Sequence, residues 1–413
     1  MKIVLVHNSY QQPGGEDIVF GQERDLLRSR GHEVVEYVRS NHEVKQFVSL
    51  RQLALAKRTI WAGDTRREFR QLLLRERPNV VHVHNTFVMI SPSIYWACRA
   101  AQVPVVQTLH NYRLFCPSGN FLREGRICEE CLQRSLWRGV SHGCYHGSRL
   151  ATATVAMMLT VHRWRETWTQ LVDCYIVLSD FARRKFQEAG LSASKLVVKP
   201  NFVAPDPGVR TGEGEYALFV GRLSEEKGLT ALLAAWDLAH CPVPLRIIGD
   251  GPLRPELEMQ VAQRKLTGIT FCGRLTHPQT LAAIKGAKFL IYPSGCYEQC
   301  PTAILEAYAC GVPVMAPALG SMEEMVADGC TGVHFRAGDP DDLAAKIQGL
   351  CWDAQRLERM GHGARAEYEA RYTPERNYQK LVKIYQGLIS SRLHLPGPRL
   401  IPGRDEQFSA DLT

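Results

Sequence analysis

The strongest signal of the fold in this chain is the stretch Tyr292-Pro-Ser-Gly-Cys-Tyr-Glu298-Gln-Cys-Pro301-Thr-Ala-Ile-Leu-Glu306-Ala-Tyr-Ala-Cys-Gly311-Val-Pro313-Val. The apolar run that leads into it, residues 287–292, predicts a buried strand that breaks at the Pro-Ser-Gly turn. A helix is predicted from near Pro301, whose fixed φ suits a first helical position, to about Cys310. Gly311 predicts a left-handed stop to that helix, with Pro313 beyond it.

Two carboxylates belong to this strand-turn-helix unit. Glu298 is predicted in the loop just ahead of the helix, and Glu306 one to two turns inside it. The free amides around Gln299, Cys300 and Thr302, together with the helix N-terminus, favour an anion at the same place. Carboxylates accept hydrogen bonds from sugar hydroxyls. The stretch therefore predicts a site for a ligand with both hydroxyls and phosphates. The competing interpretation is a solvated turn glutamate and an ordinary helical one.

Composition limits the class of protein. The 413 residues suffice for two domains, and the net charge of +8 fits anionic ligands or an anionic membrane face but is too small to favour nucleic acid. The first residues enter a strand without the features of a signal peptide, and no apolar run is long enough to span a membrane. We therefore expect a cytoplasmic protein whose 13 cysteines are mostly reduced, either buried or gathered on a metal.

The first half of the chain predicts an α/β domain over residues 1–203. Gly14 and Gly15 precede its first helix and would let the backbone approach a ligand. His110 follows a predicted strand, at the carboxyl end where ligands of open α/β sheets bind, although an isolated histidine is more often structural. The predicted elements are the strands at 2–6, 33–38, 79–84, 104–109 and 174–178 and the helices at 17–30 and 65–76.

A cysteine-rich insertion, residues 113–147, follows His110. It has the spacing Cys-x11-Cys-x2-Cys-x12-Cys, made by Cys116, Cys128, Cys131 and Cys144. The inner Cys-x2-Cys can bind a tetrahedral ion from one tight turn, and the outer pair would close the site. The segment is rich in glycine and shows little apolar periodicity. Two interpretations stay open, namely a structural zinc site and four incidental reduced thiols.

The second domain, residues 212–374, begins after a linker rich in turn formers. Its first strand leads into Gly221-Arg222-Leu-Ser-Glu-Glu-Lys227-Gly. Gly221 gives backbone room, Arg222 can fork onto a diphosphate, and Lys227 adds a positive charge. A surface loop with two cations is the alternative. Further strand exits carry Gly249 with Asp250, and Gly273 with Arg274.

These motifs resemble the retaining glycosyltransferases of family four, which have the GT-B fold. The resemblance rests on Pro-Ser-x3-Glu-x7-Glu-Ala-x-Ala-x-Gly-x-Pro-Val, on Gly-Arg-Leu-x3-Lys-Gly, on the first-loop glycine pair and on the Thr-x-His region. It implies two Rossmann-like parallel-sheet domains that face a cleft, with a last helix, about 375–391, crossing back to the first domain. Residues 392–413 are expected to form a disordered tail. The cysteine-rich insertion resembles that of only a subset of bacterial members.

The resemblance also implies roles for single residues. Glu306 would hold the nucleotide ribose, Glu298 would contact the donor sugar, and Arg222 and Lys227 would bind the diphosphate. His110 would approach the donor sugar and the reaction centre.

The resemblance also bears on three other parts of the chain. The turn Gly249–Asp250 would lie beside the nucleotide, and the backbone at Gly273–Arg274 would edge the base. Glu16 stands where the family has a small residue after the glycine pair.

The implied reaction moves a sugar from a nucleotide-diphosphate sugar, such as a UDP- or GDP-sugar, to a glycan, lipid-linked or small-molecule acceptor. The setting would be bacterial polysaccharide or cell-surface glycan synthesis, with peripheral contact at the inner membrane face. No catalytic metal is expected, because cationic side chains can neutralise the leaving diphosphate. The alternatives are a nucleotide-sugar epimerase of the same fold and a non-enzymatic, zinc-bearing interaction module.

Overall fold

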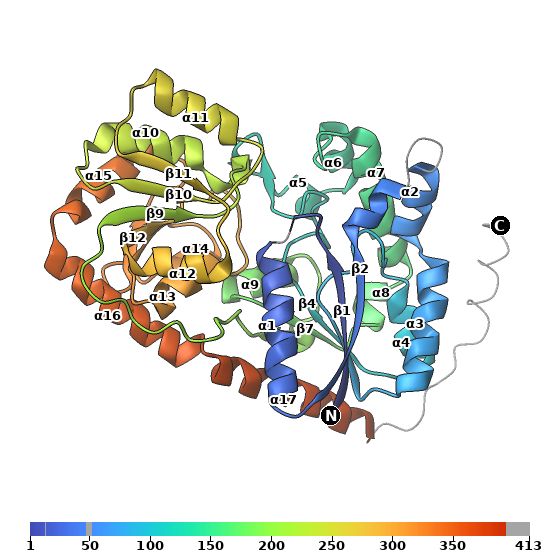
Figure 1. Cartoon of the computed structure of the whole chain (residues 1–413). Helices are drawn as coiled ribbons and strands as arrows, with labels where there is room; N and C mark the ends of the chain where they lie inside the picture. Colours follow the sequence, from blue (N-terminus) through green and yellow to red (C-terminus); the bar gives the residue numbers. More distant parts are fainter. Residues whose placement is uncertain (13, 47–51, 394–413) are drawn as a thin grey trace.

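The computed structural model describes residues 1–12, 14–46 and 52–393 of the chain. The predicted tail therefore lies, from residue 394 onward, outside the described residues. Two α/β units stand side by side, each built around a six-stranded sheet with helices on both faces (Figure 1). The fold class predicted from the sequence, two Rossmann-like parallel-sheet units, is confirmed.

The first sheet has the strand order β2-β1-β3-β4-β7-β8, and every neighbouring pair is parallel. Its central strands are buried along their length, as strands covered by helices on both faces must be. The strands are β1 (Lys2–Ser9), β2 (Glu33–Ser40), β3 (Val80–Val83), β4 (Val105–Thr108), β7 (Cys174–Val177) and β8 (Leu196–Val198). The covering helices are α1 (Gly15–Ser29), η1 (Asn41–Gln46), α2 (Gln52–Ile60), α3 (Gly63–Glu76), α4 (Ile94–Ala100), α7 (Arg149–Trp164), α8 (Thr167–Gln170), α9 (Asp180–Glu188) and η3 (Ala193–Lys195).

Strand β1 is longer than the apolar pattern predicts. It continues through His7 and Asn8 to Ser9, because it pairs with β2 residue by residue over its whole length. The extension moves two polar side chains from the predicted loop into the sheet, and both are buried.

The second sheet has the order β11-β10-β9-β12-β13-β14, again with all neighbours parallel. Its strands are β9 (Tyr216–Val220), β10 (Leu245–Ile248), β11 (Ile269–Gly273), β12 (Ala287–Ile291), β13 (Val314–Pro317) and β14 (Gly332–Phe335). Its helices are η4 (Glu225–Lys227), α10 (Leu229–Ala239), α11 (Arg254–Gln263), α12 (His277–Lys285), α13 (Thr302–Ala309), α14 (Ser321–Met325), α15 (Pro340–Cys351) and α16 (Ala354–Arg371).

The stretch that opens the sequence analysis forms the predicted strand, turn and helix. Strand β12 ends at Ile291, and α13 begins at Thr302, one residue after Pro301. Gly311 has φ +69°, the left-handed conformation that ends such a helix without steric cost. Helix α13 is buried on all sides, so it sits in the core beneath the site rather than on the surface.

The last helix, α17 (Pro374–Leu393), packs against the first unit. Figure 1 shows it in red, continuing from α16 along the edge of the molecule to lie beneath α1. Tyr378 lies 2.9 Å from Nε2 of His32, and the hydroxyl of Tyr385 lies 2.7 Å from Nδ1 of the buried His82. The helix is thereby fixed to two separate elements of the first unit.

The cysteine-rich insertion folds into short pieces only. These are β5 (Leu122–Arg123), β6 (Arg126–Ile127), α5 (Glu130–Gln133) and α6 (Trp137–His142). Helix α6 packs on α7. Along α7, Leu150, Met157 and Trp164 recur at heptad spacing and are exposed, so they form a second, uncovered apolar stripe. No helix among the described residues is long and apolar enough to cross a membrane. Peripheral membrane contact stays a prediction.

The cysteines differ in part from the reduced state that we predict. Cys241 and Cys351 form a disulfide that joins the end of α10 to the end of α15, across 110 residues of sequence. The other described cysteines form no disulfide in the structure. Neither partner of the disulfide belongs to a Cys-x2-Cys pattern, so sequence spacing gives no sign of this pair.

Candidate active site

The strand order of each sheet reverses once, and the predicted site residues gather where it does. In the second sheet the reversal lies between β9 and β12, and in the first between β1 and β3. Crevices beyond the carboxyl ends of strands at such positions are where open α/β sheets bind ligands. Lys227 follows β9 and Glu298 follows β12.

Lys227 and Glu298 form a direct ion pair at the reversal point of the second sheet. Nζ of Lys227 lies 2.6 Å from Oε1 of Glu298. The hydroxyl of Ser294 donates to the same oxygen at 2.7 Å, and that of Tyr292 at 3.1 Å. Nζ of Lys227 also donates to the Tyr292 hydroxyl at 2.8 Å. Two residues that are 71 positions apart in sequence thus share one polar centre.

Both members of this pair are charged in the folded protein. Burial alone would lower the pKa of Lys227, but the carboxylate of Glu298 raises it well above its usual value. Burial would likewise raise the pKa of Glu298, but Lys227 and the hydroxyl donors hold it below its usual value. The two side chains are 18% and 16% exposed, so removal of one leaves the other charged and partly desolvated. An anionic ligand can take the place of Glu298 on the ammonium.

Two glycines let the loops around this pair pack backbone against backbone. Gly228 has φ +70°, and a Cβ added there would lie 2.0 Å from the carbonyl oxygen of Pro293. Gly249 has φ +135°, and its Cβ would lie 1.8 Å from the carbonyl oxygen of Gly221. No side chain fits at either position. The exits of β9, β10 and β12 are therefore held together at backbone distance.

A pocket opens beside these strand exits, between the two units. Its volume is about 390 Å³. Arg222 is exposed there, and its positive charge adds to the burial that lowers the pKa of His146 in the insertion of the first unit. The insertion thus faces the diphosphate-binding loop predicted from the sequence. The pocket is lined by Gln12, Arg222, Asp250, Gly251, Pro252 and Arg274.

The other predicted glutamate, Glu306, has a partner that the sequence analysis does not single out. Nε2 of His277 lies 3.1 Å from Oε1 of Glu306, and this hydrogen bond raises the pKa of the imidazole. His277 begins α12, and its Thr-His-Pro context gives no sequence signal of the pairing. Glu306 is buried on α13, about one turn from the helix start at Thr302.

The loop before α13 carries polar groups that lack partners. Both side-chain amide atoms of Gln299 are buried and without a hydrogen bond among the described residues. The neighbouring Cys300 has a buried thiol, and its carbonyl accepts from Asn201 of the hinge at 3.1 Å. Across the cleft, a Cβ on Gly15 would lie 3.6 Å from the hydroxyl of Thr302, so α1 and α13 begin close together. Two helix N-termini therefore face one region, which favours an anion there.

His110 stands at the end of β4, on the first unit's side. Its Nε2 lies 3.0 Å from Nδ1 of His84, and the two rings stack. Nε2 of His84 is buried and has no partner in the described part of the chain. A narrow cavity of about 50 Å³ lies beside both rings, and Asn111 and Arg113 share in its lining. His84 is a site residue that sequence reasoning missed. Its only signal is the Val-His-Val-His pattern of β3.

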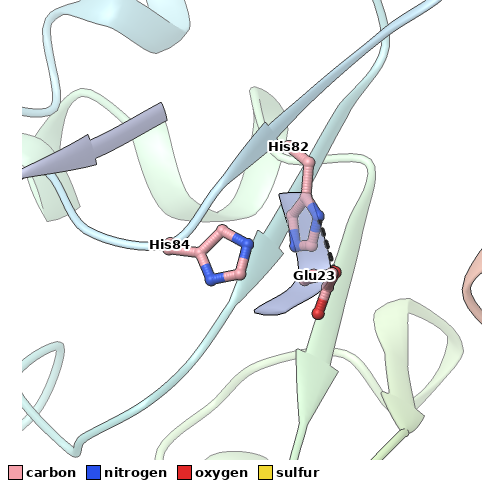
Figure 2. Close-up of side chains that lie close together, drawn as sticks. All are labelled: Glu23, His82 and His84. Atoms are coloured by element: carbon pink, nitrogen blue, oxygen red, sulfur yellow. Dashed lines mark ion pairs between the residues drawn. The ribbon is translucent and has the colours of Figure 1, made fainter. Parts of the chain in front are cut away.

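Figure 2 shows His84 close to two other buried polar side chains, Glu23 and His82. Among the residues that the structure describes, one trio of potential metal ligands, Glu23, His82 and His84, has its ligand atoms within 4.8 Å of one another. The ammonium of Lys199 lies 3.1 Å from Glu23, and both ring nitrogens of His82 have hydroxyl partners within 2.8 Å. Because Lys199 already balances the carboxylate, we interpret the trio as a hydrogen-bonded network that anchors α17.

The buried histidines predict how stability depends on pH. Burial lowers the pKa of His82 to about 4, and those of His84 and His110 well below the usual value. Each is neutral when folded and takes up a proton near pH 6.5 when unfolded. Their contribution to stability is therefore complete above pH 6.5 and is lost as the pH falls below it, down to about pH 4 for His82. The loss is about 1.4 kcal/mol per pH unit for each histidine.

Urea unfolding at pH 7, 6 and 5 measures this loss. Glu16 should offset part of it, because burial raises the pKa of its carboxyl to about 8 and the protonated form is favoured on folding. The matched control is His362→Gln, at an exposed position on α16, which should leave the slope unchanged. An unfolding free energy that stays constant over this range would contradict the prediction.

Both halves of the chain match known families. Residues 14–207 match the family described as Glycosyltransferase Family 4, and residues 214–353 match Glycosyl transferases group 1. Glycogen synthase of Mycobacterium tuberculosis is 28% identical over 303 residues, which cover 70% of this chain and 64% of the relative. Phosphatidyl-myo-inositol mannosyltransferase of Mycolicibacterium smegmatis is 26% identical over 401 residues, which cover 92% and 91%. The chain spans 60% to 64% of the length of three of the curated relatives that it matches, the glycogen synthase among them.

Solved structures share the architecture. HepE of Anabaena, in complex with UDP and glucose, superposes with a TM-score of 0.67 at 19% identity, over 94% of this chain and 100% of that one. Two parallel sheets of this order, with a pocket between them, define the GT-B class of proteins. Within that class, the chain belongs to the group 1 glycosyltransferases of family 4.

The remaining predicted residues lie at the same edge of the second sheet, at the start of α1 or in the insertion. Gly221 follows β9, and Gly273 ends β11 with φ +70°. Gly14 precedes α1 in extended backbone. Cys116, Cys128, Cys131 and Cys144 are neighbours in the insertion, but no three of their sulfur atoms lie within 4.8 Å of one another among the described residues.

Proposed function

We propose that this protein transfers a sugar from a nucleotide-diphosphate sugar to a hydroxyl acceptor, with retention of the anomeric configuration. The observation that carries the proposal is the charged Lys227–Glu298 pair at the reversal point of the second sheet, beside a pocket that Arg222 lines. An ammonium and a guanidinium near one pocket suit a diphosphate, and a half-buried carboxylate suits sugar hydroxyls.

Donor binding would exchange partners that are paired in the free protein. The diphosphate would bind Arg222 and Lys227, and it would free Glu298 for the hydroxyls of the donor sugar. The ribose hydroxyls would take the place of His277 on Glu306. Gln299, whose buried amide has no partner in the described part of the chain, would gain one. Each exchange replaces one hydrogen bond by another, so no buried charged side chain is left without a partner when the donor binds.

The chemistry follows from where charge develops. As the bond between the anomeric carbon and the β-phosphate oxygen breaks, negative charge grows on the diphosphate, where Lys227, Arg222 and the α13 N-terminus stabilise it. The acceptor oxygen bonds to the anomeric carbon on the same face, and its proton passes to the departing phosphate oxygen. His110 would border the sugar from the first unit. A covalent glycosyl-enzyme trapped on Glu298 would overturn this order of events.

A panel of nucleotide sugars tests the proposal through thermal unfolding. We expect one nucleotide class to raise the melting temperature, with UDP-sugars tried first, because a ligand at 100 times its Kd adds about 2.7 kcal/mol to stability. Arg222→Ala should abolish the shift, because it removes a diphosphate partner. The matched control, Arg336→Ala on an exposed loop after β14, should keep it.

Product analysis then separates the alternatives. A transferase should give a glycosylated acceptor and a free nucleoside diphosphate, whereas an epimerase would convert the donor sugar without any acceptor. If no nucleotide sugar shifts the melting temperature, and metal removal instead abolishes binding of a protein partner, the chain would be an interaction module.

A further inference from the structure

The cysteine-rich insertion, residues 113–147, borders the cavity beside His110 and is called the wall of that cavity below. It contains little regular secondary structure. Its two ends meet on Arg113, whose Nη1 donates to the carbonyl of Pro117 at 3.0 Å and whose guanidinium lies 5.2 Å from the ring centre of Tyr145. Arg113 lines the narrow cavity next to His110. The shape of this wall therefore depends on whatever holds residues 113–147 together.

The four cysteines converge on one point of the insertion. A Cβ added to Gly139 would lie 3.4 Å from Sγ of Cys131 and 3.1 Å from Pro117, the residue after Cys116. The backbone N–H of Cys144 donates to the carbonyl of the same Gly139 at 3.1 Å. The Cys-x2-Cys turn, the first cysteine and the last one thus meet around α6. All four thiols are free, and three of them are half-buried.

Tight turns present the cysteines to this point. The β5–β6 hairpin turns through Glu124 and Gly125, which have φ +51° and +70°, and the N–H of Cys128 closes it by donating to the carbonyl of Phe121 at 2.7 Å. Gly143, with φ +65°, precedes Cys144. Structural zinc sites commonly take two ligands from a Cys-x2-Cys turn and further ligands from a second turn. Here the β5–β6 hairpin leads directly into Cys128-x2-Cys131, and the turn at Gly143 leads into Cys144.

We propose that Cys116, Cys128, Cys131 and Cys144 bind one structural Zn²⁺, which fixes the wall beside His110. The proposal stands independently of the transfer reaction. Tetrahedral coordination with Zn–S distances of about 2.3 Å needs sulfur atoms about 3.8 Å apart. No three of the four sulfur atoms lie within 4.8 Å of one another in the described part of the chain. Side-chain rotation would therefore have to draw the sulfur atoms together when the metal binds.

Metal analysis of the whole protein, purified without added metal, tests the proposal. We expect inductively coupled plasma mass spectrometry to find about one zinc ion per chain. Cys128→Ser and Cys131→Ser should each lower the zinc content at least tenfold. Cys330→Ser, at an exposed free cysteine of the second unit, should leave it unchanged.

If the serine variants fail to fold, the wild-type protein decides the matter. Treatment with a strong chelator should release zinc and should make four thiols reactive that were unreactive towards a colorimetric thiol reagent before. A protein isolated without metal whose insertion thiols react at once would overturn the proposal. So would a disulfide between two of the four cysteines, found by peptide mapping. Nucleotide binding is not the readout, so failure here leaves the proposed function untouched.

Discussion

Lys227→Met should reduce kcat/KM by about 100- to 1,000-fold, the effect expected when one preorganised charge at a leaving group is lost. It should also destabilise the fold by about 1–3 kcal/mol, because Glu298 would remain half-buried with hydroxyl donors but no countercharge. Steady-state kinetics and urea unfolding measure the two effects separately.

A double variant separates catalysis from folding. Lys227→Met combined with Glu298→Gln removes both charges while keeping both shapes, so it should recover much of the lost stability. The activity should stay low, because the diphosphate still lacks its ammonium. Donor affinity and kcat/KM that match the wild type in Lys227→Met would contradict the assignment of this loop to the diphosphate.

Gly249→Ala should abolish the folded second unit. The added Cβ would lie 1.8 Å from the carbonyl oxygen of Gly221, and the residue would keep φ +135°. Overpacking and backbone strain each cost about 1–3 kcal/mol, and here they coincide. Soluble yield, circular dichroism and urea unfolding measure the outcome.

Gly387→Ala is the matched control for that substitution. Gly387 lies within α17, and an added Cβ there would meet no atom within 4 Å. Alanine should stabilise the helix by about 0.5–1 kcal/mol. A Gly249→Ala protein as stable as the wild type would show that the exits of β9 and β10 are not packed as described.

Much of the fold could be predicted because its signals are local. The apolar run into Tyr292, and Gly311 after α13, mark a buried strand and a helix end without knowledge of the rest of the chain. The end of β1 was wrong by three residues, because His7 and Asn8 are polar and only their pairing with β2 makes them strand. The disulfide between Cys241 and Cys351 joins distant positions, and no spacing pattern marks it.

For the candidate site, sequence spacing placed single residues but not their mutual contacts. Motif resemblance singled out Lys227 and Glu298 separately, and their direct pairing follows from β9 and β12 being neighbours in the sheet. The partnership of His277 with Glu306 depends on two helices meeting, which no local pattern records. The predicted roles in donor binding stay predictions until ligands are tested.

The path of α17 makes the second unit an insert within the first, since the chain leaves at residues 199–203 and returns before Pro374. The two crossings lie together: the N–H of Val203 donates to the carbonyl of Tyr372 at 3.2 Å, and Asn377 donates to the carbonyl of Pro200 at 3.3 Å. Residues 204–373 could therefore be exchanged between relatives as one cassette, because its two junctions (the seams) lie next to each other. Recombination at those seams would exchange the second unit while the first unit stays intact, whereas a cut at one seam alone would separate α17 from the unit on which it packs.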